Sequence, residues 1–149
     1  MIDGVRIVPK RRIVDDRGAI FHMLRRDDPE FGAFGEIYFS KVWPGVVKAW
    51  HLHSRMTLNY MLIVGAVRLA LYDDRPNSPS HGRHQELTLD PMVPQLVIIP
   101  PLVWNGFKGL GTEASIIANC ASEPHSADEI QRRPHDDPYF RYDWSQRHC

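Results

Sequence analysis

The sequence predicts an all-β protein folded as an antiparallel barrel. Short runs rich in β-branched and aromatic residues recur along the chain, and Pro, Gly, Asp and Asn separate them. The predicted strands cover residues 5–8, 19–24, 36–42, 46–53, 58–64, 66–73, 85–89, 95–99 and 115–120. A chain of 149 residues has the usual length of one domain, so we predict a single domain over residues 1–149.

Turn and cap residues set the connections between these elements. Gly65 lies between two apolar runs and predicts a tight hairpin. One segment, 126–133, has a helical pattern, with Ser126 as the N-cap, Glu129 three residues later and Pro134 as the stop. We therefore predict one short helix near the C-terminus.

Composition excludes several classes of protein. Lysine and arginine together number 18, as do aspartate and glutamate, and no basic stripe indicates a nucleic-acid binder. The first residues are too polar for a signal peptide, and the longest apolar stretch, 95–103, contains prolines and is far shorter than a membrane span. Cys120 and Cys149 have no metal-site or disulfide spacing, which predicts free thiols in the reducing cytoplasm.

Two histidines in the predicted strand 46–53 are the first candidates for chemistry. Side chains alternate along a strand, so His51 and His53 share one face while Lys48 points to the other. Imidazole titrates near neutrality, so such a pair suits metal binding or acid–base catalysis. The alternative is that both rings only satisfy backbone groups.

The spacing of these histidines is also that of metal-binding cupins. Those proteins supply a Glu shortly after the pair and a third His on a later strand. Thr57 or Leu58 stands at the Glu position here, and Asn105 stands at the His position. Because His51 and His53 alone leave an ion short of the usual three or four protein ligands, we expect no metal and no other cofactor.

A set of short motifs runs through nearly the whole chain in a recognisable order. The motifs are Asp16-Arg17-Gly18, Ser40, Gly45-Val46-Val47-Lys48-Ala49-Trp50-His51, Gly65-Ala66-Val67, Tyr72-Asp73-Asp74-Arg75, Ser78-Pro79, Ile99-Pro100, Asn105-Gly106-Phe107, Asp137-Pro138 and Asp143-Trp144. In this order and spacing they resemble the dTDP-4-dehydrorhamnose 3,5-epimerase family of metal-free cupins, which act on nucleotide sugars. The resemblance implies a cupin-type jelly roll.

The resemblance also implies roles for individual residues. It assigns the catalytic base to His51 and the carboxylate that orients it to Asp137. Removal of a proton next to a ketone needs a base whose pKa lies near the working pH, and a carboxylate fixes the imidazole tautomer. Lys48 stands where the family usually has Arg and would stabilise the enolate oxygen, but a bulge or twist is needed to bring it to the face of His51. The residues expected to contact the substrate are Arg17, His22, Lys48, His53, Arg55, Tyr60 and Asn105.

Other positions depart from the family pattern. Counting along the chain places Ala118 where the family has a catalytic tyrosine, and Asn105 replaces a histidine. His22 replaces an acidic residue, and Arg55 is the only cation between His53 and Gly65.

These departures leave more than one function open. The first is a sugar-nucleotide isomerase that epimerises C3, C5 or both, with Tyr60, Tyr38 or water as the second proton donor. The second is a non-catalytic cupin that binds a sugar nucleotide or a small anion. A metal-dependent cupin that uses His51 and His53 is the third.

We also expect a homodimer, because a barrel with exposed edge strands protects them by pairing with a second copy. The resemblance implies exchange of N-terminal strands, with 19–24 as the exchanged strand. Arg17 and His22 would then lie near the partner's pocket.

Overall fold

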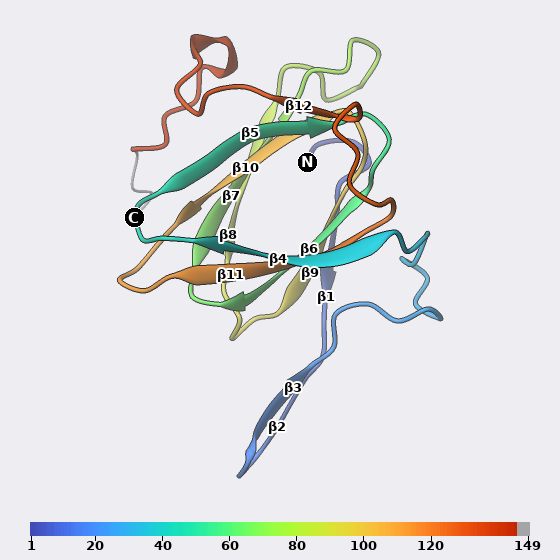
Figure 1. Cartoon of the computed structure of the whole chain (residues 1–149), viewed down its shortest axis with the longest axis vertical. Coiled ribbons are helices and arrows are strands. Elements are labelled where there is room, and N and C mark those ends of the chain that lie inside the picture. Colours follow the sequence, from blue (N-terminus) through green and yellow to red (C-terminus); the bar gives the residue numbers. More distant parts are fainter. Residues whose placement is uncertain (146–149) are drawn as a thin grey trace.

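The structure, a computed structural model, describes residues 1–145 and consists of strands joined by turns (Figure 1). Cys149, expected to be a free thiol, lies outside these residues; Cys120 is free. The strands are β1 (Arg6–Pro9), β2 (Arg12–Asp15), β3 (Gly18–Phe21), β4 (Glu36–Val42), β5 (Val47–His53), β6 (Leu58–Val64), β7 (Val67–Asp73), β8 (His84–Leu89), β9 (Gln95–Ile99), β10 (Val103–Gly109), β11 (Ser115–Ala121) and β12 (Ile130–Arg132).

Two five-stranded antiparallel sheets form the barrel. One has the order β1-β9-β6-β11-β4 and the other β12-β5-β10-β7-β8, while β2 and β3 form a separate hairpin that projects from the barrel (Figure 1). The predicted all-β, cupin-type fold is thus confirmed. Three predicted strands, 36–42, 58–64 and 95–99, coincide with β4, β6 and β9. The sequence analysis missed β2, β10 and β12.

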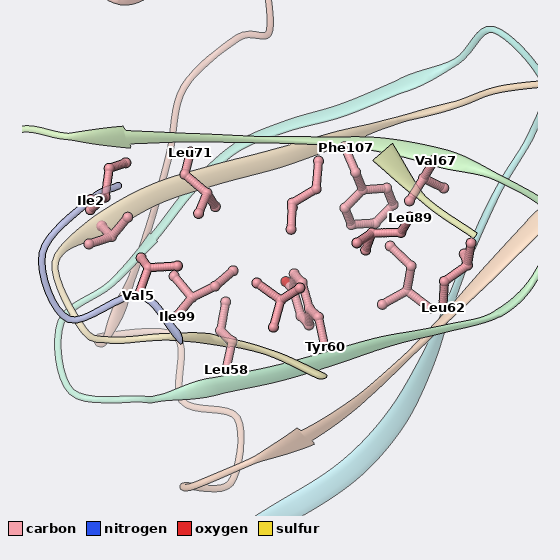
Figure 2. Packing of buried hydrophobic residues seen from close by; sticks show 14 of the residues in the cluster. Ile2, Val5, Leu58, Tyr60, Leu62, Val67, Leu71, Leu89, Ile99 and Phe107 are labelled. Atoms are coloured by element: carbon pink, nitrogen blue, oxygen red, sulfur yellow. The ribbon is translucent and has the colours of Figure 1, made fainter. Parts of the chain in front are cut away.

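The main core lies between the two sheets, where both contribute apolar side chains (Figure 2). Leu58 and Ile99 come from one sheet, and Leu71 and Phe107 come from the other. Burial of each such side chain stabilises the fold by about 1.5–3 kcal/mol. The edge strand β4 shows the period of two plainly, since its inward residues are half-buried while Ile37 and Phe39 are exposed.

A second cluster covers the outer face of the β5-containing sheet. Trp50 is fully buried there and stacks on Phe140, with 4.4 Å between ring centroids, and Trp104 and Trp144 pack around them. This cluster holds the C-terminal segment against the outside of the barrel. Residues just before Phe140 are therefore kept on the side of the sheet opposite the interior.

The predicted helix over 126–133 is not present. Residues 130–132 form strand β12, which pairs with β5, and the only helical element in residues 1–145 is a single 3₁₀ turn, Pro138–Phe140. The local pattern was overridden because pairing with β5 satisfies the backbone groups and because Glu129 turns inward to bind His53. Residues 1–145 contain no helix that is long and apolar enough to cross a membrane.

Candidate active site

A cavity of about 480 Å³ opens between the two sheets. Its walls come from β4, β6 and β11 on one side and from β5 and β10 on the other, with further residues from the segments around β12. The lining residues are Glu36, Tyr38, Ser40, Lys48, His51, His53, Met56, Tyr60, Phe107, Ile117, Asn119, His125, Ile130 and Arg132.

A bulge in β5 brings Lys48 and His51 to the same cavity. Asn105 of β10 pairs with His51, but Phe107, two residues later, pairs with Lys48, three residues back on β5. The extra residue on β5 breaks the strict alternation of faces, which is the irregularity that a shared site for these two residues requires. The peptide bond between Ala49 and Trp50, within the bulge, is cis.

Lys48 is fixed inside the cavity by two neighbours. Its Nζ donates a hydrogen bond to Ser40 Oγ at 2.6 Å, and the ammonium lies 5.8 Å from the centre of the Phe107 ring. A cation held in this way beside His51 is suited to stabilise negative charge on a substrate oxygen.

His51 is an uncharged imidazole at neutral pH. Burial lowers the pKa of His51 to about 4, and the positive charges of Arg132 and Lys48 contribute to the shift. Asn105 Nδ2 donates a hydrogen bond to the backbone oxygen of His51 at 3.1 Å and so holds this part of β5 in place. His51 therefore presents a free lone pair to the cavity.

The predicted hydrogen bond between His51 and Asp137 is not present. The Asp137 carboxylate instead accepts a hydrogen bond from the backbone N–H of Tyr139 at 2.9 Å and an ion-pair contact from Arg133 at 3.4 Å. Asp137 is also absent from the cavity lining. The physical reason is the outer aromatic cluster, which holds Phe140 and its neighbours on the face of the sheet opposite His51.

The histidine–carboxylate pair of this cavity is formed by His53 and Glu129. Nδ1 of His53 bonds to Oε1 of Glu129, and both side chains are buried. Burial raises the pKa of Glu129, but hydrogen bonds from His53 and from the backbone of Met56 and Arg55 outweigh it, so the pKa is lowered overall. The carboxylate is thus ionised, and His53 Nδ1 is the donor.

Two tyrosines face the histidines from the opposite sheet. Tyr60 on β6 donates from its hydroxyl to Asn105 Oδ1 at 3.3 Å, and Asn119 Nδ2 donates to the Tyr38 hydroxyl at 3.0 Å. Burial raises the pKa of Tyr60 well above 10, and Tyr38 adds to the shift. The Tyr60 hydroxyl therefore keeps its proton at neutral pH.

Ala118 does not belong to the cavity. Ile117 and Asn119 line it, so Ala118 lies on the opposite face of β11, between Phe39 and Met61 of the neighbouring strands. Cys120, two residues later, lies on the same outward face. The loss of a catalytic tyrosine at this position is therefore not supported by the geometry.

Four predicted contact residues do not line the cavity of their own chain. Asn105 is fully buried, and its amide bonds to the Tyr60 hydroxyl and to the backbone oxygen of His51. Arg17 sits at the tip of the β2–β3 hairpin and pairs with Asp15 at 2.7 Å, and His22 follows the same hairpin. Arg55 forms ion-pair contacts with Glu123 at 3.4 Å and Asp128 at 3.9 Å.

Glu36, His125 and Arg132 line the cavity but were missed by the sequence analysis. Arg132 lies directly across from His51 in the pairing of β12 with β5. That pairing was hidden by the helical pattern of 126–133, and no sequence signal marked His125. Within residues 1–145, no group of three or more His, Cys, Asp or Glu side chains is arranged to hold a metal ion.

A cupin-type barrel that holds imidazoles, a half-buried cation and tyrosine hydroxyls around one cavity defines a class of proteins that bind small polar molecules in the barrel interior. The sequence matches the dTDP-4-dehydrorhamnose 3,5-epimerase family over residues 1–149. The chain belongs to this family of sugar-nucleotide isomerases, which confirms the resemblance seen in the motifs.

Individual relatives agree with this placement. The chain is 32% identical over 135 residues to a probable low-salt glycan biosynthesis epimerase of Haloferax volcanii, covering 88% of this chain and 86% of that protein. It is also 32% identical over 148 residues, 97% of each chain, to a spore coat polysaccharide biosynthesis protein of Bacillus subtilis. The crystal structure of a dTDP sugar isomerase from Desulfovibrio desulfuricans G20 superposes with a TM-score of 0.95 at 41% identity, covering 99% of this chain and 94% of that one.

Proposed function

We propose that this protein epimerises a nucleotide-linked 4-keto-6-deoxy sugar at C3, C5 or both, through an enolate, with His51 as a catalytic base. The observation that carries the proposal is the placement of an uncharged imidazole beside a fixed cation, with tyrosine hydroxyls on the facing sheet. This is the set of groups that proton exchange next to a ketone requires.

The reaction begins with proton removal. His51 takes a proton from the carbon next to the ketone, the C–H electrons form a carbon–carbon double bond, and the carbonyl electrons move to the oxygen. Lys48 stabilises the negative charge that develops there.

Return of a proton to the opposite face completes the inversion. Tyr60 and Tyr38 are the proposed donors because β6 and β4 face β5 across the cavity. The tyrosinate recovers its proton from water, and His51 releases the proton that it took, so the net reaction is an isomerisation.

Cations at the cavity support binding of a substrate that carries phosphate. Lys48 and Arg132 both line the cavity, and the His125 imidazole lines it as well. A bound diphosphate would offset the positive field of Lys48 and Arg132, which is one cause of the lowered pKa of His51. Substrate binding would thereby make His51 a stronger base.

The β2–β3 hairpin supports a homodimer as part of the proposal. It projects from the barrel with exposed apolar side chains, among them Val14 and Ile20 (Figure 1). Packing against a second copy would bury them and would bring Arg17 and His22 to the partner's cavity, where the same chain does not place them.

Hydrogen exchange in deuterated water tests the proposed function. Wild-type protein incubated with a dTDP-linked 4-keto-6-deoxyhexose should introduce deuterium at C3 or C5, as followed by proton NMR. Because general-base catalysis contributes roughly 10²–10⁴ in rate, His51→Asn should lower exchange by about that factor. Wild-type protein that binds dTDP but exchanges no hydrogen would instead be a sugar-nucleotide binding protein.

A further inference from the structure

His53 and Glu129 form a buried pair to which the mechanism above gives no task. One oxygen of Glu129 accepts from His53 Nδ1, while the other accepts from the backbone N–H groups of Met56 at 3.3 Å and Arg55 at 3.4 Å. The carboxylate is therefore fixed from three directions. Ser54 adds a further restraint, since its backbone N–H donates to the Glu129 carbonyl at 2.8 Å.

This arrangement determines which nitrogen of His53 is available to a substrate. Because Nδ1 donates its hydrogen to Glu129, the lone pair of a neutral His53 ring lies on Nε2. His53 lines the cavity, so Nε2 is the ring nitrogen left for a bound molecule. The carboxylate behind the ring also stabilises the imidazolium that forms when the base takes a proton.

His51 has the opposite surroundings. Burial disfavours the charged form of its ring, and the positive charges of Arg132 and Lys48 act in the same direction. No carboxylate of residues 1–145 accepts a hydrogen bond from the His51 ring, so the imidazolium form of His51 has no bonded counter-charge. Of the two rings, His53 is the one equipped as an oriented base.

The spacing of the two rings matches the chemistry of a ketone. His51 and His53 are two residues apart on the cavity face of β5, which separates their Cα atoms by about 6.6 Å in a regular strand. A 4-keto sugar has an acidic carbon on each side of the ketone. Two neighbouring imidazoles can therefore each approach a different carbon of the same bound sugar.

We propose that His53 is a second catalytic base of this cavity, with Glu129 as its positioning residue, and that it acts on the carbon across the ketone from the one served by His51. The proposal rests on the proposed function. Nε2 takes the proton, the C–H electrons form the double bond, and the carbonyl electrons move to the oxygen beside Lys48. A tyrosine hydroxyl then gives a proton to the other face, and water exchanges with both protein groups.

His53→Asn is the variant that isolates Nε2. The Asn amide keeps an N–H that can donate to Glu129, so the buried carboxylate retains a partner while the reacting nitrogen is lost. Exchange in deuterated water should fall about 10²–10⁴-fold at one of the two carbons, with KM unchanged. His51→Asn should lower exchange at the other carbon. His84→Asn, the same change at an exposed ring whose Nε2 bonds to the Phe140 carbonyl, is the matched control and should leave both rates unchanged.

Glu129→Gln tests the positioning role. It removes the charge behind His53, so kcat for the His53-dependent carbon should fall with KM unchanged, and the acid limb of that rate should move to lower pH. A purely structural role would lower the melting temperature without moving this limb. If His53→Asn does not fold, Glu129→Asp, which withdraws the carboxylate from the ring, carries the same expectation.

The outcomes separate this proposal from the proposed function. Wild-type protein that exchanges neither carbon refutes the proposed function and the role of His53 with it. Folded His53→Asn that exchanges every wild-type position within about threefold of the wild-type rate refutes only the role of His53. Loss of exchange at one carbon in His53→Asn and at the other in His51→Asn supports both.

Discussion

Charge placement around single residues sets the chemistry of this cavity. His51 and His53 are the same residue type on the same strand, yet one faces cations and the other a buried carboxylate. Sequence analysis identified both rings from their spacing. The predicted pair of His51 with Asp137 was wrong, because the motifs pointed to Asp137. Glu129 comes close to His53 only when β12 pairs with β5.

The lowered pKa of His51 predicts how stability depends on pH. The folded protein binds a proton at His51 only near pH 4, whereas an unfolded chain does so near 6.5. The neutral ring therefore favours the folded state above about pH 6.5, and this contribution is lost as the pH falls toward 4. Urea unfolding of His51→Gln should lose less stability between pH 6.5 and 4.5 than the wild type. An equal loss in both proteins would show that His51 titrates normally.

At the scale of elements, the strands were predictable where burial alternates or an apolar run is bounded by turns. β4 and β6 are of these kinds. β10 was missed because prolines precede it and Asn105-Gly106 interrupts its apolar pattern. The sequence indicated that a bulge in β5 was needed, but its presence could not be predicted. The bulge arises from the way β5 pairs with β10, and the residues of β5 alone do not reveal it.

The tight hairpin predicted at Gly65 is not present, because β6 and β7 belong to different sheets and do not pair. Gly65 instead lies in the short turn that carries the chain from one sheet to the other, and this turn gives a direct test of one element. Gly65 has φ +85°, and a Cβ built there would lie 2.3 Å from Ser115 Oγ and 2.9 Å from Ser115 Cα. Gly65→Ala should therefore lower the free energy of unfolding by about 2–4 kcal/mol, from backbone strain and overlap together.

Gly111→Ala is the matched control for Gly65→Ala. Gly111 has φ +73° but no atom within 4 Å of a built Cβ, so only the backbone strain, about 1–2 kcal/mol, is expected. Equal losses in the two variants, measured by urea unfolding, would show that the contact with Ser115 carries no strain.

At the scale of the whole molecule, the two sheets enclose the cavity while the β2–β3 hairpin stands apart from them (Figure 1). Its side chains Ile13, Val14 and Ile20 are 39%, 57% and 61% exposed. This exposed apolar surface is the one that the proposed homodimer would cover.

Disruption of that surface tests the proposed homodimer. Ile20→Lys should convert a dimer into a monomer in sedimentation velocity, because a charge would be buried in the interface. Val93→Lys, at a residue that is 64% exposed between β8 and β9, should leave the sedimentation coefficient unchanged. A wild-type protein that sediments as a monomer would rule out the dimer.

Strand β5 is the wall between the cavity and the outer aromatic cluster, and this gives the protein an optical property. Trp50 is fully buried on one side of the strand, and its ring centroid lies 5.2 Å from that of Trp144. Its neighbour His51 faces the cavity on the other side of the strand. Filling the cavity changes the electric field across a wall only one strand thick. Intrinsic tryptophan fluorescence should therefore report ligand binding, without any label and without an indole in contact with the ligand.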